Sequence, residues 1–159
     1  MKYFTHYSSP IGRMTLQADQ HALLGVWFAT QTTQPSDLGH ESQTCPILKQ
    51  TIQQLNEYFA GQRRQFDLPL AATGTPFQQS VWRGLCAIPY GATCSYQQLA
   101  EAIGNPQAVR AVGVANSKNP LSIIVPCHRV VGKDGQLTGY AGGLERKAFL
   151  LDLEQRTST

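Results

Sequence analysis

The sequence predicts an α+β protein with two lobes, an N-terminal α/β lobe with an antiparallel sheet and a helical C-terminal lobe. Three observations lead to this prediction. Apolar and polar residues alternate with period two over 3–28, as in antiparallel strands. A helical repeat of apolar residues follows in 46–59, and two helix-capping motifs open the second half. We place the lobe boundary in 71–74, so that 1–72 and 73–159 form the two domains.

The N-terminal lobe is expected to be a meander of strands covered by one helix. The helix begins at Pro46 and stops at Gly61, because proline favours the first helical position and glycine ends helices. Residues 30–45 are rich in Gln, Thr, Ser and Gly, which indicates a surface loop. The predicted strands are 3–8, 14–18, 23–28 and 66–70.

Two capping boxes mark helices of the C-terminal lobe. In each box a hydroxyl residue is followed three positions later by glutamine, Thr75 by Gln78 and Ser95 by Gln98. A third helix is expected from 105 to about 116. The last two helices have the outline of a helix–turn–helix, whose second member can enter a DNA groove. Plain packing of two adjacent helices is the alternative.

The second helix of that pair has unusually small side chains. Residues 108–115 are Ala, Val and Gly apart from Arg110. Small residues let a backbone approach a partner closely, and one long cation on a thin helix suits a groove, where an inserted side chain can separate stacked bases. If the helix instead packs into the core, Arg110 needs a buried partner.

The excess of positive over negative charge lies entirely in the second half of the chain. The net charge is +3; 1–72 hold five basic and five acidic residues, whereas 73–159 hold eight and five. Much of this excess lies around Cys127 in the sequence, which favours an anionic partner such as DNA. A solvated surface with a small surplus of charge is the alternative.

The cysteines indicate a reducing compartment. There is no Cys-x-x-Cys pair and no recognisable signal peptide, so we expect free thiols and a cytoplasmic location. No apolar run approaches the ~20 residues that span a bilayer, so no membrane insertion is expected. We interpret Cys86 and Cys94 as core residues and Cys45 as incidental. Cys127 remains as the cysteine with polar neighbours.

Cys127 is followed directly by His128 and Arg129. A reactive thiol needs a nearby base or positive charge, and both are present here. A zinc deaminase would require His-x-Glu and then Pro-Cys-x-x-Cys. Val130 occupies the position of the second cysteine, and no histidine is followed two residues later by glutamate. This chemistry is excluded, and we expect no metal.

Two chemistries of Cys127 remain at this point. A cysteine hydrolase or redox sensor would take its base from a distant part of the chain. In an extended strand Cys127 and His128 would point to opposite faces, so a water or a local kink would have to join them. Attack on an alkyl carbon needs no oxyanion hole, only a thiolate and a proton donor for the leaving group. Tyr96 and His128 are candidates for that donor.

In the order of its motifs the chain resembles the O6-alkylguanine-DNA alkyltransferases, also called methylated-DNA–protein-cysteine methyltransferases. The motifs cover most of 76–154, whereas the N-terminal lobe matches only in layout. They are Ile88-Pro89-Tyr90-Gly91, Ser95-Tyr96-Gln97-Gln98-Leu99-Ala100, Gly104-Asn105-Pro106, Arg110-Ala111-Val112-Gly113, Asn119-Pro120, Pro126-Cys127-His128-Arg129-Val130, Tyr140, Gly142-Gly143-Leu144 and Glu154.

The resemblance implies a ribonuclease-H-like N-terminal lobe that serves as a scaffold and a C-terminal lobe with a winged helix–turn–helix. It also implies direct DNA repair: the alkyl group of O6-alkylguanine, and also of O4-alkylthymine, is transferred irreversibly to Cys127 after the base is flipped out of duplex DNA. Each molecule would act once, without a metal or organic cofactor. We expect a monomer that binds double-stranded DNA, with cooperative binding left open.

Site roles follow from the same resemblance. His128 is expected to deprotonate Cys127 through a water, so that an ion pair forms, and Glu154 to orient His128. Tyr96 is expected to rotate the phosphate and protonate the departing guanine, and Asn119 to brace the active-site segment. The expected DNA contacts are Arg110, which fills the gap in the stack, with Tyr96, Ala108, Ala111, Gly113 and Arg129. The expected pocket residues are Val125, Ser122, Tyr140 and Ala141.

Two pocket positions depart from the family pattern. Ser122 stands where proline is expected and Ala141 where serine is expected, so the size of the accepted alkyl group and the binding of free-base inhibitors are open. A rival interpretation is a non-enzymatic relative that binds damaged DNA. Such relatives lack the cysteine, so Cys127 argues against it.

Overall fold

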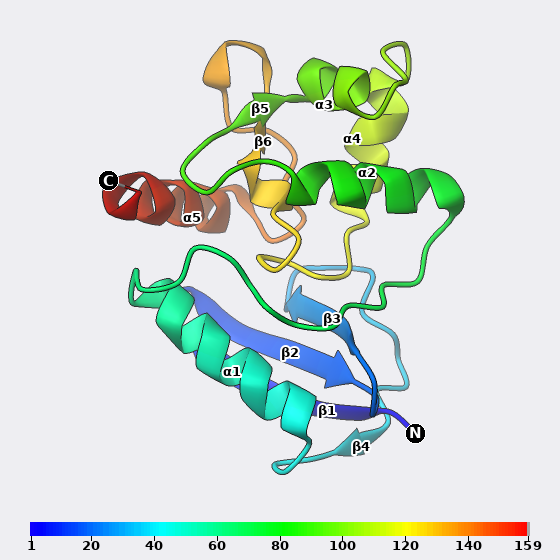
Figure 1. Cartoon of the computed structure of the whole chain (residues 1–159), viewed down its shortest axis with the longest axis vertical. Coiled ribbons are helices and arrows are strands. Elements are labelled where there is room, and N and C mark those ends of the chain that lie inside the picture. The colour runs from blue at the N-terminus through cyan, green and yellow to red at the C-terminus, as the bar shows by residue number, and fades with distance from the viewer. Residues whose placement is uncertain (159) are drawn as a thin grey trace.

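The computed structural model describes residues 1–158. Its two lobes are stacked on each other, with the sheet and the first helix in one and the remaining helices in the other (Figure 1). The segment between the first two helices runs along the junction of the lobes (Figure 1). Within residues 1–158 no helix combines the length and the apolar character needed to cross a bilayer.

The N-terminal sheet is a three-stranded antiparallel meander with one short added strand. The strands lie in the order β3-β2-β1-β4, and β4 pairs with β1 in parallel. The three meander strands are confirmed, but the prediction that 30–45 is entirely loop is wrong, because β4 lies within it. The strands are β1 (Tyr3–Ser9), β2 (Gly12–Ala18), β3 (Leu23–Phe28) and β4 (His40–Glu41).

Helix α1 (Pro46–Phe59) begins and ends close to the predicted residues. It packs on the sheet through an apolar face that includes Leu48 and Leu55. The strand predicted for 66–70 is wrong: only Leu70 forms a bridge, to Leu23. Pro69 in this segment has no N–H to donate to a ladder, which limits strand pairing there.

Both capping boxes form as predicted. The Thr75 hydroxyl accepts from the Gln78 N–H at 3.1 Å, and the Gln78 side chain accepts from the Thr75 N–H at 3.0 Å. Ser95 and Gln98 repeat the pattern. Such caps contribute about 1 kcal/mol each. The helices that follow are α2 (Pro76–Cys86) and α3 (Tyr96–Ala102), and the next along the chain is α4 (Val109–Ser117), which packs against both.

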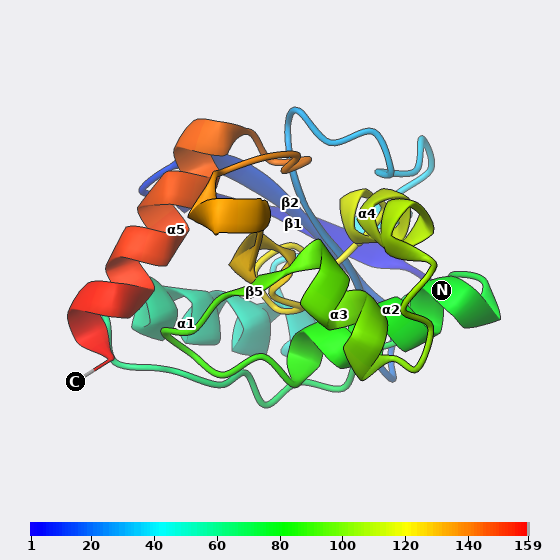
Figure 2. The ribbon, with the colours of Figure 1, turned by 90° about the horizontal axis from the view of Figure 1, so that it is seen from above.

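The segment around Cys127 is a tight turn. Residues Cys127–Arg129 form the 3-10 helix η1, so the chain has the local kink that we named as one alternative for this segment. The last helix, α5 (Leu144–Thr157), packs against η1. Seen from above, α5 lies on the side of the C-terminal lobe opposite α3 and α4 (Figure 2). The remaining elements are the parallel pair β5 (Cys94–Ser95) and β6 (Val130–Val131) and the 3-10 helix η2 (Lys133–Gly135).

The two lobes share one hydrophobic core. Residues 119–125, which lead to Cys127, pair with strand β3: the Val26 N–H donates to the Pro120 carbonyl at 2.8 Å, and the Ser122 N–H donates to the Val26 carbonyl at 3.1 Å. Val26 and Leu121 are fully buried at this junction. The N-terminal sheet therefore holds the segment that positions the reactive cysteine.

Candidate active site

The segment before Cys127 is fixed by Asn119. The Asn119 amide donates to the Val125 carbonyl at 2.9 Å, and its oxygen accepts from the Leu121 N–H at 3.0 Å. Ile123 between them has φ 72°, a left-handed conformation that typically costs a β-branched residue about 1–3 kcal/mol. The position of Asn119 fits the bracing role expected for it.

The thiol of Cys127 is buried, with 3% of the residue exposed. Burial raises the pKa of this thiol to about 11, although a hydrogen bond from Asn119 and the charge of Lys147 act in the opposite direction. The thiol is therefore neutral at pH 7 in the DNA-free protein. Burial therefore acts against the expected thiolate–imidazolium pair, which stays a prediction.

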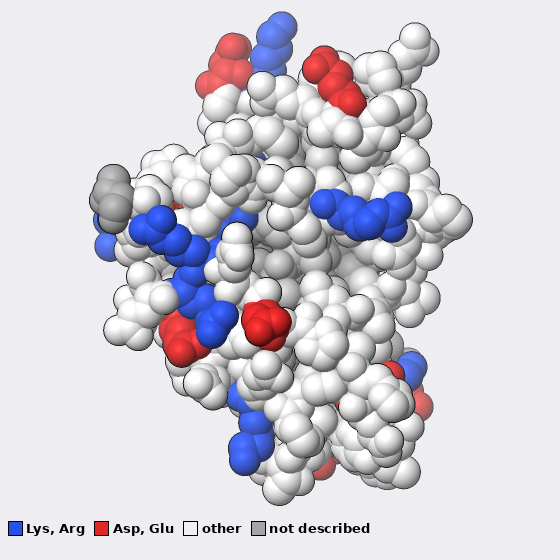
Figure 3. Space-filling view, viewed as in Figure 1, with Lys and Arg blue, Asp and Glu red and all other residues white. Residues whose placement is uncertain are grey.

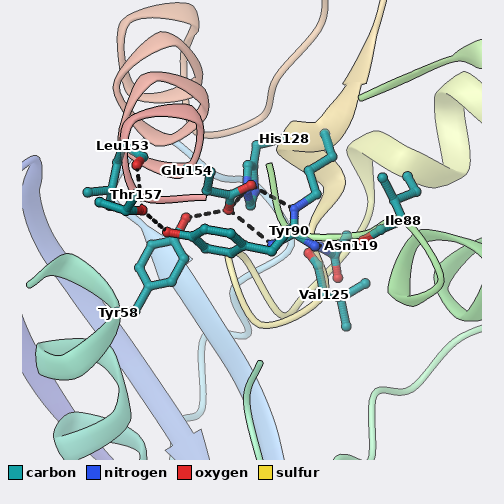
Figure 4. Close-up of polar contacts among 10 residues, drawn as sticks. Tyr58, Ile88, Tyr90, Asn119, Val125, His128, Leu153, Glu154 and Thr157 are labelled. Atoms are coloured by element: carbon teal, nitrogen blue, oxygen red, sulfur yellow. Dashed lines mark hydrogen bonds and ion pairs between the residues drawn. The ribbon is translucent and has the colours of Figure 1, made fainter. Parts of the chain in front are cut away.

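His128 is fully buried next to Cys127. Its Nε2 lies 2.6 Å from Glu154 Oε2 (Figure 4), whereas its Nδ1 has no hydrogen-bond partner among residues 1–158. Burial lowers the pKa of the imidazole, and Glu154 opposes that shift. Burial thus favours the neutral ring, in which Nε2 donates its proton to Glu154 and the Nδ1 lone pair can act as a base.

Glu154, on α5, is the centre of a buried cluster of polar side chains (Figure 4). Its Oε1 accepts from Arg129 Nε at 2.8 Å, and its Oε2 accepts from Arg129 Nη2 at 3.1 Å and from the Tyr58 hydroxyl at 2.6 Å. Burial acts to raise the pKa of the carboxyl, but hydrogen bonds from His128 and Arg129, together with the charge of Arg129, outweigh it and hold the pKa at about 2. Glu154 is thus a carboxylate at every physiological pH.

Arg129 does not face the DNA side of the protein. Its guanidinium is bonded to Glu154 and donates from Nη1 to the Ile88 carbonyl at 2.7 Å. It also lies 5.5 Å from the centre of the Tyr90 ring. The prediction that Arg129 contacts DNA is therefore wrong, because its charge is already paired inside the protein.

Among the expected pocket residues, Val125 contacts Cys127 directly, because its carbonyl accepts from the Cys127 N–H at 2.8 Å. Val125, Ser122 and Tyr140 are buried, and Ala141 is half-buried. The Tyr140 hydroxyl has no hydrogen-bond partner among residues 1–158. Burial, followed by the proximity of Cys127, raises the pKa of this phenol well above 10, so it stays protonated. The neighbouring Ser122 hydroxyl donates to the Gln31 side chain at 2.7 Å.

The candidate DNA-binding face is the exposed side of α4. Arg110 and Ala111 are exposed, Ala108 and Gly113 are half-buried, and Val114 is 56% exposed. No hydrogen bond or ion pair of the Arg110 side chain occurs within residues 1–158. The rival placement of this helix, with Arg110 buried in the core, is wrong.

Tyr96 stands at the start of α3, close to α4. Its ring approaches the backbone of Gly113, and its hydroxyl donates to the Thr138 carbonyl at 3.2 Å.

Figure 3 shows that Lys and Arg side chains on the face drawn there occur singly or in small groups, separated by uncharged surface. No continuous basic patch covers that face.

Sequence reasoning missed three polar residues of the site: Tyr58, Lys147 and Gln31. Tyr58 follows Leu55 by three positions, and Lys147 precedes Leu150 by three, so helical spacing already put both on apolar faces. Lys147 is fully buried, donates to the Thr138 carbonyl at 2.8 Å, and has a pKa lowered by burial to about 8. Gln31 lies in a polar loop, where no such signal exists.

Of the two cysteines interpreted as core residues, Cys94 is half-buried and packs against the core, whereas Cys86 is exposed, so that interpretation is wrong for Cys86. Cys45 is buried. Among residues 1–158 no group of three or more His, Cys, Asp or Glu side chains is arranged to hold a metal ion. The fold and the site thus define a two-lobed protein with a buried cysteine, histidine and glutamate beside an exposed helix–turn–helix.

The comparisons with known proteins agree with this description. Residues 2–72 match the ribonuclease-like domain of 6-O-methylguanine DNA methyltransferase, and 76–156 match its DNA-binding domain. The methylated-DNA–protein-cysteine methyltransferase of Methanosarcina barkeri is 45% identical over 153 residues, 96% of this chain and 97% of that protein. The constitutive enzyme of Bacillus subtilis is 45% identical over 159 residues, 98% of this chain and 96% of the enzyme.

Solved structures give the same result. The O6-methylguanine methyltransferase of Mycobacterium tuberculosis has a TM-score of 0.91 at 45% identity, covering 100% of this chain and 96% of its own. The M. tuberculosis protein in complex with DNA has a TM-score of 0.92 at 44% identity, covering 98% and 94%. This chain therefore belongs to the 6-O-methylguanine DNA methyltransferase family. The predicted family, α+β fold class and enzyme class are confirmed.

Proposed function

We propose that Cys127 accepts the methyl group of O6-methylguanine in double-stranded DNA and keeps it. The observation that carries this proposal is the arrangement at His128, the residue after Cys127: its Nε2 lies 2.6 Å from Glu154 Oε2, while its Nδ1 has no hydrogen-bond partner among residues 1–158. Among the cysteines of the chain, Cys127 is the one with this surrounding. Family membership supplies the reaction class.

The proton of the thiol leaves in the course of the reaction. A water between Cys127 and His128 Nδ1 carries the proton to the imidazole, and Glu154 stabilises the imidazolium that forms. The sulfur then attacks the methyl carbon, the bond from that carbon to O6 breaks, and the electron pair stays on the guanine. Lys147 and Asn119 favour the transient thiolate, since both lower the pKa of Cys127.

Tyr96 and Arg110 prepare the substrate. The methyl group is shielded inside the duplex, so the base must be flipped out at a cost of a few kcal/mol. Arg110 fills the gap that the base leaves, and the small residues of α4 let the helix approach the DNA closely. Tyr96 supplies the proton that the departing guanine takes up.

The substrate range and the state of the protein complete the proposal. Contacts are chiefly with phosphates, so binding weakens with salt and depends little on sequence. O4-alkylthymine is a second substrate of the same kind. Each monomer acts once, because the thioether formed on Cys127 has no route back to a thiol.

The substitution Cys127→Ser tests the proposal. The variant should bind methylated duplex DNA with unchanged affinity, since the thiol is buried away from the α4 face, but should transfer no methyl group. Binding is measured by fluorescence anisotropy and transfer by loss of O6-methylguanine from the oligonucleotide. Cys86→Ser is the matched control, because Cys86 is an exposed thiol on α2, and it should transfer normally. Transfer by Cys127→Ser would refute the assignment.

A further inference from the structure

The N-terminal lobe contributes one polar side chain directly to the buried cluster around Glu154. Tyr58 lies on α1, 96 positions from Glu154, and its hydroxyl is 2.6 Å from Glu154 Oε2. The same oxygen lies 2.6 Å from His128 Nε2 (Figure 4). The phenol and the imidazole therefore share one carboxylate oxygen.

The ring of Tyr58 has little freedom to move this hydroxyl. The residue is completely buried, and its ring packs on Phe66 at 5.5 Å and against Tyr90 at 6.3 Å between centroids. Its phenol stays protonated, because burial and the charge of Glu154 raise its pKa well above 10. Tyr58 is thus a fixed donor, and Glu154 is a permanent acceptor.

Arg129 and Tyr58 hold Glu154 from different elements. The Arg129 guanidinium donates twice to the carboxylate and once to the Ile88 carbonyl, so it is itself fixed. The Tyr58 hydroxyl approaches Oε2 from α1 and adds a donor from the other lobe. It also takes up part of the negative charge of Oε2, which acts on His128 and Arg129.

We infer that Tyr58 is a positioning residue for methyl transfer, which holds Glu154 so that His128 presents Nδ1 to the thiol. The inference rests on the function proposed above and assigns part of the active-site machinery to the N-terminal lobe. Tyr58 does not touch the substrate, and it acts through Glu154 and His128. The expectation that this lobe is only a scaffold is thereby replaced.

Other titratable groups face this cluster and stay in place when the Tyr58 hydroxyl is removed. They come from η1, from the loop after α2, and from α5 with the loop before it. They are Cys127, Arg129, Tyr90, Tyr140 and Lys147. A change confined to the phenol of Tyr58 therefore reports on the bond to Glu154.

The test is Tyr58→Phe, with Tyr7→Phe as its matched control. Phenylalanine keeps the ring packing of Tyr58 and removes only the hydroxyl. The Tyr7 hydroxyl donates at 2.7 Å to Asn56, which lies on α1 like Tyr58. Tyr7 makes no bond to Glu154. The maximal single-turnover rate and the half-saturating concentration of methylated duplex are measured from pH 5 to pH 9, a range of about four units that brackets the ordinary pKa of histidine.

Tyr58→Phe should lower the maximal rate about 10-fold, a part of the ~10²- to 10⁴-fold that a positioned base supplies. The half-saturating concentration should not change. Because Glu154 then acts more strongly on His128, the acidic limb of the rate profile should move to higher pH. Tyr7→Phe should leave all three quantities unchanged.

A wild-type rate in Tyr58→Phe would overturn the inference, and so would a lower rate with an unmoved acidic limb, which is the result of a purely structural role. Peptide mapping of each reacted protein separates this failure from that of the proposed function. A methyl group on Cys127 together with a wild-type rate refutes the role of Tyr58 alone. A methyl group on another residue refutes both.

Discussion

Arg129 and Arg110 belong to the same lobe, yet their surroundings are opposite. Arg129 is 7% exposed and bonded to Glu154 and the Ile88 carbonyl, whereas Arg110 is exposed without an ion-pair partner in the described residues 1–158. The interior around Glu154 therefore holds charges that compensate each other, and the α4 surface offers a charge to an external anion. The proposed function assigns chemistry and DNA engagement to these two separate regions, so substitutions should separate them.

The largest expected effect is on the buried region. Glu154→Gln leaves the Arg129 guanidinium buried without a counter-charge, which should lower the free energy of unfolding by about 3–5 kcal/mol. Urea unfolding at pH 7 measures it. Asp152→Asn is the matched control, because Asp152 lies on the same helix in an exposed pair with Arg156 at 2.7 Å and should cost under ~1 kcal/mol. Equal losses would contradict the contrast between buried and exposed charge.

Acid should weaken the same region. The folded-state pKa of Glu154 is lowered from 4.5 to about 2, so its stabilisation is complete above pH 4.5 and is lost as the pH falls toward 2. The loss is about 3 kcal/mol. The lowered pKa of His128 adds destabilisation that begins below pH 6.5, because the unfolded chain takes up a proton that the buried ring resists.

Urea titrations between pH 7 and pH 3 test this expectation, a range of about four units in which carboxyl and imidazole groups titrate. Glu154→Gln serves as the reference, since it removes the carboxyl group. The variant should lose less stability than wild type below pH 4.5. Parallel curves below that pH would contradict the assignment of the low pKa to Glu154.

A smaller effect is expected at the exposed region. Arg110→Ala should slow methyl transfer from duplex DNA about 10-fold, because the gap in the base stack is no longer filled and flipping costs a few kcal/mol. Stability should not change. Arg13→Ala, an exposed arginine on β2, should change neither quantity. For Arg110→Ala, the single-turnover rate relative to wild type should fall less with single-stranded substrate than with duplex. An equal fall would contradict the role of Arg110 in the base stack.

Local patterns predicted the local structure well. Thr75 and Gln78 form their capping box because the interaction depends only on residues three positions apart. The meander strands likewise follow from alternation within a few residues. The strand predicted for 66–70 fails because alternation does not show whether a partner strand is free to pair.

Contacts between distant segments could not be predicted. The bond from Tyr58 to Glu154 joins two lobes, and no spacing rule connects positions 96 residues apart. Arg129 was assigned to DNA on the resemblance, yet its guanidinium points inward to Glu154 from the 3-10 turn of η1. The roles of Cys127, His128 and Glu154 came from the resemblance, and the structure adds the contact between His128 and Glu154.

The most direct test of the account is the fate of the methyl group. The wild-type protein is incubated with a slight excess of duplex oligonucleotide containing O6-methylguanine, and the protein is examined by intact-mass analysis and peptide mapping. The account predicts a gain of one methyl group per molecule, on the peptide that holds Cys127, with no further turnover. A methyl group on Cys86 or Cys94, or repeated turnover with unmodified protein, would contradict it.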